Sequence, residues 1–279
     1  MRLAIVGHGF VGKAVDYGFS NQKIEKWIID PNYKNADDIK LLPNWRADLV
    51  FVCVPTPMGD DGNIDSSILD DVMKKLAKCN KETLIVIKST VTPSVISDYR
   101  YKANVVYNPE FLTEKSACEQ FVNPEFHIFG GDIYNTNKLE DFYHKYSLCT
   151  PCQSFHMNLE EASLVKYSIN SFLATKVTFF NQLYDLCETN GSVNFNTIIK
   201  AVGADQRIAP SHTKVPGFDG KQGYGGACFP KDTLAFAKYS NELTLLAKAI
   251  EINNNYRSQY DRDEREKEQN IQFNHVQNG

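Results

Sequence analysis

The sequence predicts an α/β protein, in which a Rossmann-like, doubly wound parallel sheet is followed by a smaller all-helical domain entered through a long central helix. Three observations predict this fold. Short apolar segments alternate with polar, helix-like segments over the first half of the chain, a pattern typical of parallel strands joined by crossover helices. A glycine-rich turn follows the first apolar segment directly, and a long stretch without proline or glycine begins near residue 158.

Composition restricts the class of protein. A chain of 279 residues that is 42% hydrophobic can bury a substantial core, and one large or two medium domains fit this length. A formal net charge of −4 gives no general attraction to nucleic acid. No apolar stretch approaches the roughly 20 residues that cross a bilayer, and the seven cysteines are an odd, scattered set typical of reduced thiols. We therefore expect a cytoplasmic protein that binds neither nucleic acid nor membranes.

Six segments are expected to be strands, because several of them are continuous Val, Ile, Leu and Phe runs of the kind found in strands buried on both faces. They lie at residues 2–6, 26–29, 49–54, 84–88, 104–107 and 127–130. Helices are expected between them at residues 11–20, 66–79 and 94–101. Asp65 can cap the second helix, and Pro93 lies near the start of the third.

The second half of the chain has a helical pattern. From residue 158 to 188, apolar residues fall at 162, 165, 169, 172, 173, 177, 180, 183 and 186, which describes one long amphipathic helix. Asn158 and Glu161 have the spacing of a capping box at its start. Further helices are expected within residues 196–202 and 233–257, which lie before and after a glycine- and proline-rich loop at 210–226. A helix of this length bridges domains or packs against a second copy of the chain.

These patterns predict three parts. Residues 1–157 form a dinucleotide-binding domain, and residues 158–260 form a helical domain that contains a cysteine-bearing loop. Residues 261–279 hold eight charged residues and few apolar ones, so we expect a disordered tail there.

The glycine-rich turn is the first motif with a chemical meaning. Gly7, Gly9 and Gly12 form a G-x-G-x-x-G pattern between the first strand and the first helix, where close backbone approach lets a pyrophosphate lie at the helix N-terminus. Asp30 ends the second strand, 21 residues after Gly9. A carboxylate at this distance accepts hydrogen bonds from the adenosine ribose and repels a 2′-phosphate. The motif predicts NAD rather than NADP.

Other polar residues have two interpretations from the sequence alone. Glu110 and Glu114 are four residues apart beyond the fifth expected strand, and they suit either acid/base chemistry or a solvated surface. Lys166 and Asn170 lie on one face of the long helix beside apolar neighbours. They form either an exposed polar stripe or a functional pair at the edge of a buried seam.

The segment from Gly223 to Asp232 reads Gly-Tyr-Gly-Gly-Ala-Cys-Phe-Pro-Lys-Asp. A cysteine after a flexible glycine run, with a cation and a helix start nearby, can be an activated nucleophile. In isolation Cys228 could equally be a small buried hydrophobe. The pair Cys149 and Cys152 has redox-like spacing, but it lacks a second cysteine pair for zinc and does not follow a strand.

In their order along the chain, these segments resemble the UDP-glucose/GDP-mannose 6-dehydrogenase family over roughly residues 1–257. The resemblance rests on the glycine turn and on the segments at residues 54–57, 88–91, 108–114, 166–181, 205–208 and 223–232. It implies oxidation of the C6 primary alcohol of a nucleotide sugar to the uronic acid. It also implies two NAD molecules per turnover, no metal, UDP-glucose as the first candidate substrate, and a homodimer through the long helix.

The resemblance also assigns residues. Cys228 is implied as the nucleophile that forms a thiohemiacetal and then a thioester, with Lys166 and Asn170 stabilising the developing oxyanion. Asp232 is implied in proton transfer, and Glu110 with Thr90 in positioning water. The residues implied to face the cofactor are Gly7, Gly9, Phe10, Val11, Gly12, Asp30, Pro55, Thr56, Thr90 and Glu114. Those implied to contact the substrate are Glu110, Phe111, Leu112, Lys166, Asn170, Tyr224 and Gly225.

This sequence departs from the family pattern in two ways. Family members carry a third domain that supplies much of the nucleotide pocket, whereas this chain ends 22 residues after Arg257 in polar sequence. Two explanations stay open for the nucleotide: another chain supplies the pocket, or the substrate differs. Thr113 and Phe126 stand where the family has basic residues, which weakens diphosphate binding. Two alternatives stay open: a single-step 3-hydroxyacid-type dehydrogenase, and a non-catalytic NAD-binding subunit that needs a partner chain.

Overall fold

The computed structural model describes residues 1–100 and 104–273. The chain divides into two compact units. The first unit comprises Met1–Thr56 and Asp65–Lys166, and the second comprises Pro57–Ile64 and Tyr167–Gly279. The division therefore falls within the long helix α7 (Leu159–Asn190), and the short segment Pro57–Ile64 groups with the helical half of the chain.

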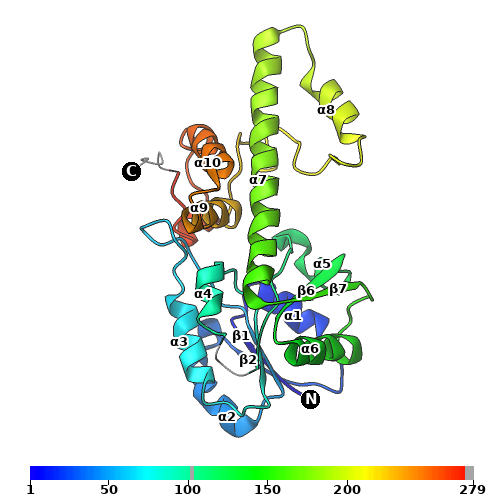
Figure 1. The fold of residues 1–279 in the computed structure, drawn as a ribbon, viewed down its shortest axis with the longest axis vertical. Coiled ribbons are helices and arrows are strands. Elements are labelled where there is room, and N and C mark those ends of the chain that lie inside the picture. The colour runs from blue at the N-terminus through cyan, green and yellow to red at the C-terminus, as the bar shows by residue number, and fades with distance from the viewer. Residues whose placement is uncertain (101–103, 274–279) are drawn as a thin grey trace. The chain divides into compact units, whose positions relative to one another are not determined.

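The first unit contains a seven-stranded sheet in the order β2-β1-β3-β4-β5-β6-β7, part of which is labelled in Figure 1. Neighbouring strands pair in parallel except β5 and β6, which are antiparallel. The strands are β1 (Arg2–Val6), β2 (Glu25–Ile29), β3 (Leu49–Val52), β4 (Leu84–Ile87), β5 (Val105–Tyr107), β6 (Phe126–Gly131) and β7 (Gln153–Met157). The predicted fold class and all six predicted strands are confirmed, and β7 is an additional strand.

Six α-helices are found in the described part of the first unit before α7 begins. They are α1 (Phe10–Gly18), α2 (Leu42–Trp45), α3 (Ser67–Leu76), α4 (Pro93–Ser97), α5 (Ala117–Val122) and α6 (Ile133–Tyr146). Short 3-10 helices lie at η1 (Pro31–Tyr33), η2 (Ala36–Leu41) and η3 (Glu114–Ser116). Helices α1, α3 and α4 confirm the three predicted helices, although residue 101 of the third prediction lies outside the described residues. The N-cap residue of α3 is Ser66, whose side chain makes no capping bond. Asp65, the predicted cap, lies one residue earlier and accepts from the backbone N–H of Ser67 at 2.9 Å.

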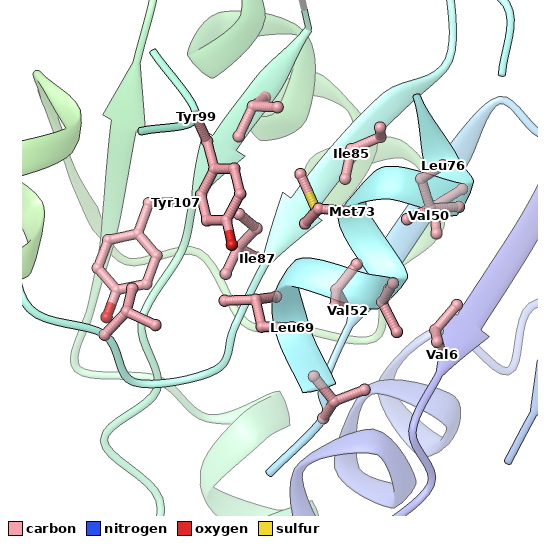
Figure 2. Packing of buried hydrophobic residues seen from close by; sticks show 14 of the residues in the cluster. Val6, Val50, Val52, Leu69, Met73, Leu76, Ile85, Ile87, Tyr99 and Tyr107 are labelled. Atoms are coloured by element: carbon pink, nitrogen blue, oxygen red, sulfur yellow. The ribbon is translucent and has the colours of Figure 1, made fainter. Parts of the chain in front are cut away.

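Side chains on the two faces of the sheet enter separate apolar clusters, because successive residues of a strand point to opposite sides. On one face, Val52 packs with Leu69 and Met73 of α3, and Figure 2 shows these side chains directed toward the strands. On the other face, Phe51 packs with Phe19 beyond the end of α1, with ring centroids 5.3 Å apart. Helices therefore cover both faces, as in a doubly wound sheet.

The second unit is helical. Helix α7 has 32 residues, and the predicted capping box is present just before it: Asn158 N–H donates to Glu161 at 2.9 Å, and Glu161 N–H donates to Asn158 at 2.8 Å. The following helices are α8 (Phe195–Gly203), α9 (Phe229–Tyr239), α10 (Thr244–Arg257) and α11 (Glu264–Glu268). The predicted helical segment at 233–257 thus consists of two helices, α9 and α10.

The end of the chain corrects one prediction. Residues 261–279 were expected to be a disordered tail, but α11 forms within this segment and Glu266 is completely buried. The helix begins with a capping box between Asp263 and Glu266. Residues 274–279 of the predicted tail lie outside the described residues. Among the helices that the structure describes, none is long and apolar enough to cross a membrane.

Candidate functional site

The glycine turn after β1 has the backbone shape that a dinucleotide requires. Gly7 has φ +89°, and a Cβ atom there would lie 2.6 Å from the carbonyl oxygen of Cys53. A Cβ on Gly12 would overlap the carbonyl of Gly7, whereas nothing lies within 4 Å of the position where Gly9 would carry one. The turn is therefore tight against β3 on one side and open at Gly9, where a pyrophosphate can approach the start of α1.

Asp30 ends β2 close to this turn. One of its carboxylate oxygens accepts from the backbone N–H of His8 at 2.6 Å, and the other accepts from that of Asn32 at 2.8 Å. Each carboxylate oxygen has a second lone pair, so Asp30 can still accept from a ribose hydroxyl. The residues present therefore fit NAD.

The carboxyl ends of β3 and β4 bring together the two threonines that the sequence singled out. Thr56 is buried, and its hydroxyl donates to the carbonyl of Thr90 at 2.7 Å. Ser89 donates to the carbonyl of Val54 at 2.6 Å. These bonds fix the two loops at the edge where ligands bind to open parallel sheets.

Glu110 and Lys166 form a buried pair in the first unit. Lys166 Nζ donates to the Glu110 carbonyl at 2.5 Å and lies 3.4 Å from Glu110 Oε1, while Glu110 Oε2 accepts from the backbone N–H of Leu112 at 2.6 Å. Only 3% of Lys166 and 8% of Glu110 are exposed. The ammonium also lies 5.1 Å from the ring centre of Phe111. The alternative of an exposed polar stripe at Lys166 is therefore wrong.

A second lysine holds the same loop from the sheet. Lys88 Nζ donates to the carbonyl oxygen and to Oδ1 of Asn108, each at 3.0 Å, and the Tyr143 hydroxyl donates to that Oδ1 at 2.8 Å. Burial lowers the pKa of Lys88 to about 8. These residues line a cavity of about 240 Å³ together with Glu110 and His127. Neither Lys88 nor Asn108 was assigned a role from the sequence.

We expect His127 to make the stability of the first unit dependent on pH. Burial lowers its pKa to about 4, and the charge of Lys88 acts in the same direction. Because the folded-state pKa lies below the unfolded value of about 6.5, the folded protein binds fewer protons between these two values. We expect the free energy of unfolding to fall by about 3 kcal/mol from this residue as pH drops from about 6.5 to about 4.

Urea unfolding of His127→Phe and of the wild-type chain across this pH range measures the contribution. A phenylalanine side chain cannot titrate, so the variant should lose less stability on acidification. Equal pH slopes in the two proteins would contradict the assignment to His127.

In the second unit, Asn170 and Asp232 are in direct contact. Asn170 Nδ2 donates to Asp232 Oδ2 at 2.6 Å, and Lys231 Nζ donates to Oδ1 of the same carboxylate at 2.6 Å. All three residues are buried. Cys228 is exposed and occupies the N-cap position of α9, where its carbonyl accepts from Asp232 N–H at 2.9 Å. Cys228 therefore stands at the N-terminal end of an 11-residue helix, the end at which the helix dipole is positive.

The glycine loop before Cys228 is held through its backbone. Asn181 accepts from the N–H of Gly223 at 2.9 Å. Asn253 accepts from the N–H of Tyr224 at 2.6 Å and donates to its carbonyl at 3.0 Å. Neither asparagine was assigned a role from the sequence, although both lie in helical segments that it identified, because a sequence does not show which loop a buried amide faces.

The predicted site residues thus fall into small groups within each unit: the glycine turn with Asp30, Thr56 with Thr90, Glu110 with Lys166, and Asn170 with Asp232. Phe111 and Leu112 belong to the Glu110 loop, and Tyr224 and Gly225 to the glycine loop. The roles of Phe10, Val11, Pro55 and Glu114 toward a cofactor stay predictions, as do the catalytic roles of all these groups.

Comparison with known proteins places the chain in a family context. The model of the UDP-glucose/GDP-mannose dehydrogenase family NAD binding domain matches residues 43–147, and that of the family's central domain matches residues 160–255. A UDP-glucose 6-dehydrogenase of Rickettsia typhi is 36% identical over 220 residues, which cover 75% of this chain and 49% of the relative. The chain therefore spans about half the length of the curated relatives it matches.

Solved structures agree with the fold. The UDP-glucose dehydrogenase from the hyperthermophilic archaeon Pyrobaculum islandicum superposes with a TM-score of 0.76 at 27% identity, over 91% of this chain and 68% of that one. The 3-hydroxyisobutyrate dehydrogenase of Mycobacterium tuberculosis has a TM-score of 0.69 at 16% identity, over 89% of this chain and 90% of that one. The second likeness shows the fold alone.

Proposed function

Because the chain belongs to the UDP-glucose/GDP-mannose dehydrogenase family over residues 43–147 and 160–255, we propose that it is an NAD-dependent nucleotide-sugar 6-dehydrogenase. It oxidises the C6 primary alcohol of the sugar to the uronic acid, with UDP-glucose as the first candidate and two NAD per turnover. The observation that carries the proposal is the exposed Cys228 at the start of α9, next to the buried group of Asn170, Lys231 and Asp232.

The residues that would bind the cofactor lie in the first unit. Gly7, Gly9, Gly12 and Asp30 would hold NAD, which when bound accepts hydride from the sugar carbon. Thr56 and Thr90 fix the neighbouring loops through their mutual hydrogen bond. The matched family domain supports this cofactor.

Cys228 would retain the aldehyde between the two oxidations. Its sulfur adds to the aldehyde carbon, and the carbonyl oxygen takes up a proton, which gives a thiohemiacetal. Loss of a second hydride from that carbon, and of the hydroxyl proton, gives a thioester. Water then breaks the carbon–sulfur bond, releasing the carboxylate and restoring the thiol. A covalent tether suits a four-electron oxidation because the reactive aldehyde cannot diffuse away.

The buried polar residues would stabilise charge on the C6 oxygen and position the hydrolytic water. Lys166 and Asn170 are donors, and they would stabilise negative charge that develops on the C6 oxygen. Asp232 would take part in proton transfer. Glu110, whose carboxylate is fixed by Lys166 and by Leu112 N–H, would position the hydrolytic water with Thr90.

A substrate screen tests the proposed activity. NADH absorbance is followed with UDP-glucose, UDP-N-acetylhexosamines and GDP-mannose, each with NAD or NADP. We expect NADH formation with one of these sugars and little reaction with NADP, because Asp30 repels a 2′-phosphate. NAD binding without turnover of any nucleotide sugar would favour the non-catalytic subunit, and turnover of a 3-hydroxyacid would favour the single-step dehydrogenase.

An exposed apolar stripe on α7 supports the proposed homodimer. Phe172, Phe179 and Leu186 recur every seven residues and are 71%, 60% and 62% exposed. Seven residues are about two helical turns, so the three side chains lie along one side of the helix. Large apolar side chains gathered on one face indicate a protein contact.

We therefore expect the double variant Phe172→Glu/Phe179→Glu to be a monomer, and the wild-type chain to be a dimer, in light-scattering measurements of mass. Tyr134→Glu is the matched control, since Tyr134 on α6 is also 71% exposed and lies away from α7 in the sequence. A monomeric wild type, or a double variant that stays dimeric, would exclude this interface.

A further inference from the structure

We propose that Glu266, in the C-terminal segment that was expected to be disordered, is a positioning residue for the glycine loop that precedes Cys228. The assignment of a catalytic consequence rests on the proposed function, because it takes Cys228 as the nucleophile and Tyr224 and Gly225 as part of the sugar site. The contact between Glu266 and the loop, in contrast, is observed within the second unit.

The Glu266 carboxylate accepts three hydrogen bonds. It is completely buried, and its Oε1 accepts from the backbone N–H of Gly226 at 2.9 Å and from the Arg257 guanidinium at 2.6 Å. Its Oε2 accepts from the backbone N–H of Asp263 at 3.0 Å. Hydrogen bonds to an ionised acceptor are stronger than neutral ones. The bond from Gly226 N–H to Glu266 Oε1 is therefore a strong restraint on the backbone at Gly226.

Arg257 links Glu266 to the rest of the loop. The guanidinium is 1% exposed, and its other terminal nitrogen donates to Asp219 at 2.6 Å. Gly225 lies directly against this ion pair: a Cβ there would lie 2.5 Å from Glu266 Oε1 and would overlap the guanidinium. The backbone at Gly225 is thus fitted to the Arg257–Glu266 pair.

The segment that carries Glu266 is anchored on both sides of that residue. Before it, Asp263 accepts from Glu266 N–H at 2.8 Å and closes the capping box. After it, the carbonyl of Gln269 accepts from Met58 N–H at 3.1 Å, and Asn270 donates to the Met58 carbonyl at 3.1 Å. These contacts fix the carboxylate in place, so it can act on the loop as a rigid support.

Glu266 also completes a set of backbone contacts. Asn181 and Asn253 hold Gly223 and Tyr224 from α7 and α10. Glu266 holds Gly226, two residues before Cys228, from a third element. Removing its charge would leave Gly226 N–H without its ionised acceptor, and the buried Arg257 with Asp219 as its remaining carboxylate partner. We infer that the backbone immediately before Cys228 would then become more mobile.

The experiment compares Glu266→Gln, which keeps the shape and removes the charge, with Glu264→Gln. Glu264 is exposed on the same short helix, so it controls for a charge change there. Hydrogen exchange is followed by mass spectrometry in peptides covering residues 223–228. We expect exchange to be about tenfold faster in Glu266→Gln, consistent with loss of one charge-assisted bond, and unchanged in Glu264→Gln.

Kinetics supply the functional readout. In Glu266→Gln, KM for the active nucleotide sugar should rise about tenfold, while KM for NAD stays at the wild-type value because its residues lie in the first unit. Glu266→Asp keeps the charge on a shorter arm and should give intermediate exchange; it replaces the Gln variant if that protein does not fold.

Unchanged loop exchange in both Glu266 variants would overturn the proposal. If the melting temperature also falls while KM stays unchanged, the role of Glu266 is purely structural. If the wild-type chain oxidises no nucleotide sugar, the proposed function fails. The exchange measurement still decides whether Glu266 holds the loop.

Discussion

Cys228→Ala should abolish the complete oxidation, lowering kcat for acid formation by roughly 10³-fold or more, as removal of a covalent nucleophile does. Without the sulfur, an aldehyde formed at C6 has nothing to bind it covalently, so a thioester cannot form. The measurement is the initial rate of uronic acid formation with the sugar identified by the screen.

Two controls separate this loss from misfolding. The thiol is exposed, so the melting temperature of Cys228→Ala should stay close to that of the wild type. NAD affinity should also be unchanged, because the residues proposed to hold the cofactor lie in the first unit. Acid formation at the wild-type rate in Cys228→Ala would exclude the covalent scheme and favour a dehydrogenase that does not use this thiol.

Lys166→Met should lower kcat by about 10²- to 10³-fold, the loss typical of removing one donor to a developing oxyanion. It should also destabilise the first unit by about 3–5 kcal/mol, since it leaves the buried Glu110 carboxylate without its cation. Steady-state kinetics and urea unfolding measure the two effects separately.

The double variant Lys166→Met/Glu110→Gln is the matched control. Neutralising Glu110 removes the unpaired buried charge, so much of the stability should return. Activity should not return, because the donor is still absent. Recovery of activity together with stability would mean that Lys166 only supports the fold.

Most of the sheet could be predicted because its central strands are continuous apolar runs. Strand β7 has the sequence Gln-Ser-Phe-His-Met and lies at the sheet edge, so its partly exposed polar side chains give no such run. The antiparallel pairing of β5 with β6 was not predicted either, since a buried apolar strand has the same composition in both orientations. Helix α6 was also missed; two of its four buried residues, Asn135 and Thr136, are polar, so its buried face gives a weak apolar pattern.

The candidate site was predictable where spacing within one segment determines geometry. The glycine turn and its carboxylate follow from a strand–turn–helix pattern. Helical periodicity places Lys166 and Asn170 on one face of α7, whereas their proposed roles come from the family resemblance. Lys88, Asn253 and Glu266 could not be assigned, because their partners lie far along the chain. Glu266 in particular stands in a highly charged segment whose composition indicates disorder, and only its contact with Arg257 and Gly226 explains its burial.

The ratio of NADH formed to nucleotide sugar consumed tests the central claim most directly. With a limiting amount of the active sugar and excess NAD, the proposed covalent four-electron oxidation gives two NADH for each uronic acid, with no free aldehyde trapped by an added amine. One NADH per substrate, with an aldehyde or ketone as the end product, would contradict it.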